Sequence, residues 1–91
     1  MKTIIAGSRT INDLSFVYQA VLDSDFEITE VVSGNARGVD KLGETFAKDQ
    51  NIPVKLFKPD WELYGKIAGH IRNGEMAEYA DALILIWESF P

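Results

Sequence analysis

The chain has 91 residues, of which 46% are hydrophobic, and this suffices for one small domain with a single core. It contains no cysteine, which excludes disulfides and cysteine-ligated zinc, so packing must stabilise the fold. The net charge of −5 opposes non-specific binding to DNA or RNA, because such binding comes mainly from neutralising phosphates.

Apolar patterns predict alternating strands and helices along the chain. Short β-branched or continuous apolar runs indicate strands, and apolar residues at i, i+3, i+4 and i+7 indicate helices. In chain order we expect a strand over 2–6, a helix over 14–22, a strand over 30–33, a helix over about 36–50, a strand over 53–58, a helix over about 67–80 and a strand over 82–87. Thr10 or Asn12 is the expected cap of the first helix, with Asp13 in its first turn. The aromatic segment 58–66 is expected to be a packed loop or a lid.

This alternation predicts an α/β fold with a parallel sheet, because parallel neighbours need crossover connections. The run ALILIW at 82–87 is typical of a strand covered on both faces. There is no linker or repeat, so residues 1–91 are expected to form a single domain. The first apolar run is too short for a signal peptide, and no run approaches the roughly 18 residues of a membrane helix. We therefore expect a cytoplasmic protein without membrane contact.

The arginines are placed differently from the lysines. All three arginines, Arg9, Arg37 and Arg72, lie in segments that contain glycine or asparagine, whereas the six lysines are scattered elsewhere. Two of these segments directly follow strands, and ligands of open α/β sheets bind beyond the carboxyl ends of strands. Guanidinium groups present paired donors to phosphate, and the helix expected to begin near Ala36 adds free N–H groups and the positive end of its dipole. The sequence therefore predicts a phosphate site, although the glycines alone are equally compatible with a simple tight turn.

Other residues carry weaker signals. Asp40, in the first turn of the second helix, is placed to accept a hydrogen bond from a ribose hydroxyl or to fix the loop. Trp61 can stack on a nucleobase or fill an edge of the core. Ser8 and Ser33 lack a G-x-S-x-G elbow, so hydrogen bonds to phosphate or backbone are favoured over nucleophilic roles. His70 is the only histidine and is expected to be a polar helix residue, because a metal site needs further ligands.

Four segments of the chain carry a resemblance to a known family. In chain order they are GSR, SGNARGVD, DWELYGKIAGHIRNGEM and ILIW. Together they resemble the YspA-related branch of the SLOG superfamily over nearly the whole chain. That superfamily includes the DNA-processing protein DprA and the LOG phosphoribohydrolases. The resemblance implies a Rossmann-like, three-layer α/β/α fold with a mainly parallel sheet of about four strands, and a pocket for a nucleotide-derived ligand. The residues expected to bind this ligand, from motif and resemblance together, are Gly7, Ser8, Arg9, Ser33, Gly34, Asn35, Ala36, Arg37, Gly38, Asp40, Trp61, Arg72 and Asn73. No catalytic residue, metal ligand or cofactor is assigned.

The chain departs from its relatives after the last strand. Relatives continue into a phosphate loop with Gly-Thr, another helix and a final strand, and the LOG enzymes place an essential glutamate there. This chain ends at Pro91, so their hydrolase mechanism is not carried over. We expect an apolar edge strand at 82–87, and from it either self-association or a shortened version of a longer gene product.

Four functions remain open at this point. A module that binds a nucleotide-derived small molecule, as a sensor or by sequestration, is favoured. A hydrolase of N-glycosidic or phosphate-ester bonds would need an acid or base among Asp40, Asp60, Glu62 and Glu88. A DNA-associated accessory protein like DprA is disfavoured by the net negative charge of the chain. The fourth is an interaction module whose pocket binds nothing.

Overall fold

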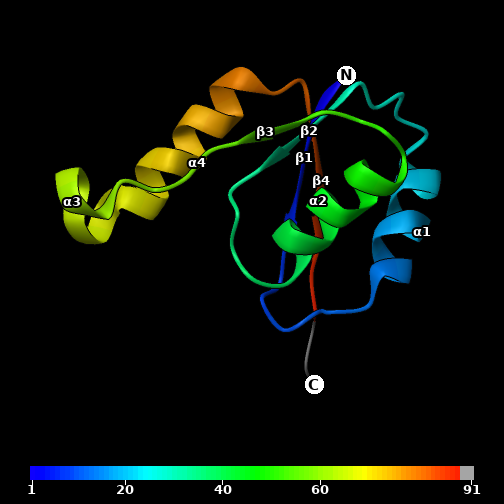
Figure 1. The fold of residues 1–91 in the computed structure, drawn as a ribbon, viewed down its shortest axis with the longest axis horizontal. Coiled ribbons are helices and arrows are strands. Elements are labelled where there is room, and N and C mark those ends of the chain that lie inside the picture. The colour runs from blue at the N-terminus through cyan, green and yellow to red at the C-terminus, as the bar shows by residue number, and fades with distance from the viewer. Residues whose placement is uncertain (89–91) are drawn as a thin grey trace.

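The computed structural model describes residues 1–88, in which strands and helices alternate (Figure 1). In chain order the elements are β1 (Lys2–Gly7), α1 (Leu14–Ser24), β2 (Glu30–Ser33), α2 (Val39–Asp49), β3 (Val54–Leu56), α3 (Trp61–Tyr64), the 3-10 turn η1 (Gly65–Ile67), α4 (Ala68–Tyr79) and β4 (Ala82–Ile86). No helix among these residues is both long and apolar enough to cross a bilayer.

The strands form one four-stranded sheet in the order β3-β2-β1-β4, and each neighbouring pair is parallel. The predicted α/β fold with a parallel sheet is therefore confirmed, and the arrangement is Rossmann-like. β2 and β3 lie on one side of β1, while β4 lies on the other and runs beside it from Thr3↔Ala82 to Gly7↔Ile86. The strand order thus reverses at β1, and this reversal decides where a ligand crevice can form.

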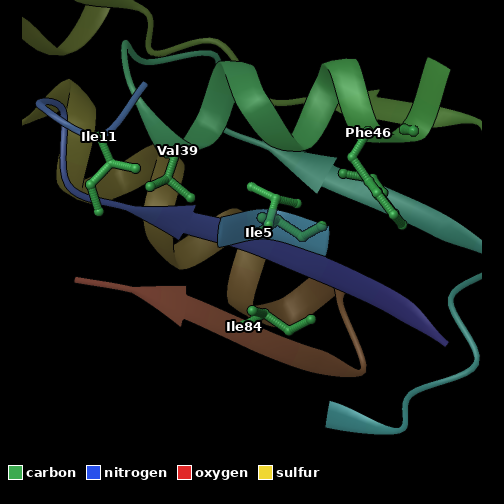
Figure 2. Close-up of a cluster of buried hydrophobic side chains, with 8 residues drawn as sticks. Ile5, Ile11, Val39, Phe46 and Ile84 are labelled. Atoms are coloured by element: carbon green, nitrogen blue, oxygen red, sulfur yellow. The ribbon is translucent and has the colours of Figure 1, made fainter. Parts of the chain in front are cut away.

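The hydrophobic core lies between the sheet and helices α1 and α2. Figure 2 shows Val39 and Phe46 of α2 pointing toward Ile5 of β1, with Ile84 of β4 in the same cluster. Ile5 and Val39 are fully buried, and each such side chain contributes about 1.5–3 kcal/mol through the area removed from water. This face of the sheet fixes the positions of β1, β4 and the start of α2.

The opposite face is only partly covered, by α4. Small clefts between α4 and the sheet are lined by Ile4 and Leu83 on the strands and by Ala77 on the helix. Leu83 and Leu85 are 55% and 60% exposed. The expectation that this strand is covered on both faces is therefore wrong for the described residues, and the expectation of an apolar edge strand is confirmed there.

Three local boundaries differ from the sequence prediction. The cap of α1 is Asp13, not Thr10 or Asn12, because the Asp13 carboxylate accepts hydrogen bonds from the backbone N–H and the hydroxyl of Ser15 at 2.9 and 2.7 Å. These bonds lower the pKa of Asp13. Helix α2 begins at Val39 rather than near residue 36. The segment 58–66 is not only loop, since it contains the short helix α3.

Candidate functional site

A cleft of about 230 Å³ lies at the carboxyl ends of β1 and β4. Because the strand order reverses at β1, this is the position at which open α/β sheets bind ligands. We call it the arginine cleft, and its lining residues are Ala6, Gly7, Arg9, Ala36, Asp40, Arg72, Asn73, Met76, Leu85 and Trp87.

The turn after β1 is tied to the start of α2. The backbone N–H of Val39 donates a hydrogen bond to the carbonyl oxygen of Ser8 at 3.1 Å. Gly38 has φ +77°, and a Cβ added there would lie 2.2 Å from the same carbonyl oxygen. Only glycine fits this close approach, which explains why the helix starts after Gly38 and why Arg9 is held beside it.

The same turn is tied to the end of β4. The backbone N–H of Ser8 donates to the carbonyl oxygen of Ile86 at 3.0 Å, and the hydroxyl of Ser8 accepts a hydrogen bond from the N–H of Glu88 at 2.8 Å. A Cβ on Gly7 would lie 1.8 Å from the Ile86 carbonyl oxygen, so a larger residue cannot replace Gly7 without moving one of the two strands. The turn after β1 and residues 86–88 at the end of β4 are therefore joined in one wall.

Arg72 reaches the cleft from α4. Its Nη1 donates to the carbonyl oxygen of Gly34 at 2.5 Å and its Nε to Oδ1 of Asn73 at 2.8 Å. These two bonds hold the planar guanidinium in one orientation. Arg9 is exposed and lines the same cleft, so guanidinium groups from two distant segments meet at one site.

Asp40 is an acidic residue that lines the arginine cleft together with Arg9 and Arg72. It is 7% exposed, and its Oδ2 accepts a hydrogen bond from the N–H of Ala36 at 3.2 Å. Burial raises the pKa of Asp40 above its ordinary value, and Glu44 raises it further; the Ala36 N–H and the charges of Arg72 and Arg9 oppose this without overcoming it.

Two amides of the turn before α2 are used within the protein. Ala36 donates to Asp40, and the N–H of Asn35 donates to Oγ of Ser33 at 3.1 Å. The Ser33 hydroxyl is fully buried and donates to Glu44 at 2.7 Å. The N-terminus of α2 thus carries an internal carboxylate, Asp40, which complements the helix dipole.

The structure brings many of the sequence-predicted residues together and leaves two apart. Six of them line the arginine cleft, namely Gly7, Arg9, Ala36, Asp40, Arg72 and Asn73. Five support its walls, namely Ser8, Ser33, Gly34, Asn35 and Gly38. Arg37 is exposed and is not among the lining residues. Trp61 is 59% exposed on α3 and lies close to Gly69 rather than in the cleft lining.

Several residues that line the cleft or support it were missed by the sequence reasoning. Trp87 directly follows β4 in the structure, but the predicted strand over 82–87 included it, so the rule that sites follow strands did not select it. Glu44 lies one helical turn after Asp40, a spacing that puts two acids on one face of α2. Met76 and Leu85 carried no signal, since they read as core. Within residues 1–88 no group of three or more acidic or histidine side chains is arranged to hold a metal ion.

The side chains of the arginine cleft can bind an anion through their positive charges, and Asp40 can accept a hydrogen bond from a hydroxyl group. Arg9 and Arg72 provide fixed positive charge, which matches phosphate or carboxylate. Asp40 is an acceptor when ionised and a donor when protonated, and its environment favours the protonated form more than water does. The wall formed by Leu85 and Trp87 is apolar, as ligand clefts commonly are.

The chain is similar to a described protein family. The family model described as "YspA, cpYpsA-related SLOG family" matches residues 1–64. The chain is also similar to the Gene 61 protein of Mycobacterium phage D29, with 36% identity over 84 residues. This match covers 82% of the chain and 66% of the phage protein. No solved structure matches the chain. The family match covers well over half of the residues, and the chain belongs to the YspA, cpYpsA-related SLOG family.

Proposed function

We propose that the arginine cleft binds the phosphate of a nucleotide or nucleotide-derived ligand, and that the protein acts by binding, as a sensor or by sequestration. The observation that carries this proposal is the presence of Arg9 and Arg72, from segments more than sixty residues apart, in one cleft beyond β1 and β4. Membership of the SLOG family supports a nucleotide-related role. A cytoplasmic location belongs to the proposal, because a chain without cysteine needs no oxidising compartment.

The phosphate is placed at the guanidinium groups rather than at the start of α2. The Asp40 carboxylate already occupies that helix end and, when ionised, repels a second anion. Within residues 1–88 the hydrogen bonds of Arg72 to Gly34 and Asn73 do not use Nη2, and Arg9 adds a second charge. Asp40 then faces the sugar, where a ribose hydroxyl can hydrogen-bond to it.

Other residues predicted to bind the ligand have supporting roles at the proposed phosphate site. Gly34 and Gly38 allow the close approaches that set the wall. Ser8 holds the loops of β1 and β4 together through its hydrogen bonds. Arg37, exposed on the same turn, adds long-range attraction for an anion.

Thermal unfolding with added ligands tests the proposal. The panel is AMP, ATP, NAD, ADP-ribose, cyclic nucleotides and inorganic phosphate, each measured with the wild type, Arg9→Ala and Arg37→Ala. A ligand at a hundred times its dissociation constant stabilises the fold by about 2.7 kcal/mol, which raises Tm by about 11–22 °C in a domain of this size. We expect Arg9→Ala to abolish this shift and Arg37→Ala, which removes the same charge outside the cleft lining, to retain most of it. No shift with any ligand would refute the proposal.

A hydrolase remains a second candidate because a buried carboxyl with a raised pKa lines the cleft. Asp40 could protonate the leaving base of a nucleoside monophosphate while water adds to the sugar carbon, giving free base and ribose 5-phosphate. Incubation with AMP, followed by chromatography, separates the two candidates. Recovery of intact AMP supports the binding module, whereas release of adenine that is lost in Asp40→Asn supports the enzyme.

We also propose that a second copy of the chain pairs with β4. This strand is at the sheet edge, and none of its five residues is charged. Two-fold antiparallel pairing centred on Ile84 would set Leu83 opposite Leu85 of the second copy. Natural edge strands usually carry charges or proline that prevent such pairing. Light scattering coupled to gel filtration tests this proposal.

A further inference from the structure

Trp87 is an exposed aromatic residue on the wall of the proposed phosphate site. It directly follows β4 and is 70% exposed. It lines the arginine cleft, and it also lines an adjoining cleft of about 610 Å³ together with Gly7, Ser8, Arg9, Thr10 and Glu88. We call the second cavity the outer cleft. Arg9 and Trp87 belong to both clefts, so a ligand bound to Arg9 lies beside the indole ring.

The backbone on each side of Trp87 is held in place. The carbonyl oxygen of Ile86 accepts a hydrogen bond from the Ser8 N–H at 3.0 Å, and the N–H of Glu88 donates to the Ser8 hydroxyl at 2.8 Å. The Glu88 carboxylate also accepts a hydrogen bond from the Thr10 hydroxyl. A large ring is thus left in solvent on a fixed backbone, which lowers the entropy lost when a flat ligand packs on it.

The charged residues that line the two clefts favour one orientation of a ligand that spans both. The arginine cleft is lined by two cations, Arg9 and Arg72, and one acid, Asp40, whereas the outer cleft is lined by one cation, Arg9, and one acid, Glu88. Phosphate therefore favours the arginine cleft. The volume of the outer cleft, about 610 Å³ against about 230 Å³, suits the larger part of the ligand.

We infer that Trp87 stacks on the base of the bound ligand and makes the site prefer nucleotides over sugar phosphates. This inference rests on the proposed function. It moves the base from Trp61, the candidate in the sequence, to Trp87, because Trp61 is on the four-residue helix α3 and outside the cleft lining. Aromatic stacking tolerates every base, since each has a flat π-face, so the preference applies to purines and pyrimidines alike.

Calorimetric titration compares the four ribonucleoside monophosphates with ribose 5-phosphate, which shares their sugar and phosphate but has no base. For the wild type we expect the nucleotides to bind about tenfold more tightly. Trp87→Ala should weaken nucleotide binding more than ribose 5-phosphate binding and so remove this preference, and Trp87→Phe should keep most of it. Trp61→Ala is the matched control and should retain the preference.

Fluorescence gives an independent readout. The chain has two tryptophans, so Trp61→Phe leaves Trp87 as the only one. AMP should then quench the emission, whereas ribose 5-phosphate should not. A nucleotide preference that survives in Trp87→Ala would overturn the inference while leaving the phosphate site intact. Failure of both ligand types to bind the wild type would overturn the proposed function as well.

Discussion

The carbonyl oxygen of Ser8 accepts a hydrogen bond from the backbone N–H of Val39 at 3.1 Å, and this bond joins the loop after β1 to the first residue of α2. The Cα of Gly38 passes close to the same carbonyl, where no side chain fits. The site wall is therefore built from two loops that follow neighbouring strands, and a change in either loop should alter both.

Gly38→Ala should destabilise the protein and weaken ligand binding. The new Cβ would lie 2.2 Å from the Ser8 carbonyl oxygen, and φ +77° is unfavourable for alanine. We expect a loss of about 1–3 kcal/mol in the free energy of unfolding, measured by urea denaturation. Gly74→Ala is the control, because that glycine lies inside α4 with open space around it and should become more stable by about 0.5–1 kcal/mol. Equal effects at both positions would contradict the close-approach argument.

Gly34→Ala should affect binding more than folding. An added Cβ would lie 2.8 Å from Nη1 of Arg72 and 3.0 Å from Oδ2 of Asp40, so the end of a flexible side chain must move. We expect nearly unchanged urea unfolding but at least a tenfold loss of AMP affinity in calorimetry, because Arg72 leaves its position. Gly69→Ala serves as comparison, since its Cβ would make ordinary contacts at 3.8 and 3.9 Å. Unaltered AMP binding in Gly34→Ala would remove Arg72 from the site.

Asp40 should make stability depend on pH in a defined direction. Burial raises its pKa in the folded protein above the ordinary value near 3.8. As pH rises from that value through the folded pKa, the unfolded chain loses a proton that the folded protein keeps, so the free energy of unfolding falls and then levels off. Asp40→Asn removes this decrease in the free energy of unfolding. Its free energy of unfolding, relative to the wild type, should increase over this interval in urea titrations between pH 4 and pH 8. A difference that stays flat or shrinks with pH would show that Asp40 is not buried in this way.

Sequence patterns predicted the elements well because strand and helix periodicities are local. They also predicted that Arg9, Arg37 and Arg72 would lie at one edge of the sheet, since carboxyl ends of parallel strands share an edge. Arg9 and Arg72 line the cleft there, whereas Arg37 is outside its lining. Which strands flank the cleft depends on the order β3-β2-β1-β4, a tertiary property. The start of α2 was missed because the backbone of Gly38 is set by Ser8, a residue thirty positions away in the sequence. The sequence pattern placed Trp87 in an apolar strand. Its exposure depends on which faces of the sheet the helices cover.

Leu83→Glu tests self-association at the edge strand. Leu83 is 55% exposed on β4, and a charge there would be buried without a partner if a second copy pairs with the strand. We expect the wild type to run as a dimer in light scattering at micromolar concentration and Leu83→Glu to run as a monomer. Leu22→Glu, at a position 74% exposed on α1, should leave the dimer intact. A monomeric wild type would refute pairing through β4.

The crystal structure of the protein with bound AMP would test the central claim most directly. We predict phosphate oxygens at hydrogen-bond distance, about 2.9 Å, from the guanidinium groups of Arg9 and Arg72, with a ribose hydroxyl at Asp40. AMP bound with its phosphate away from both arginines, or an arginine cleft that stays empty at saturating AMP, would contradict this account.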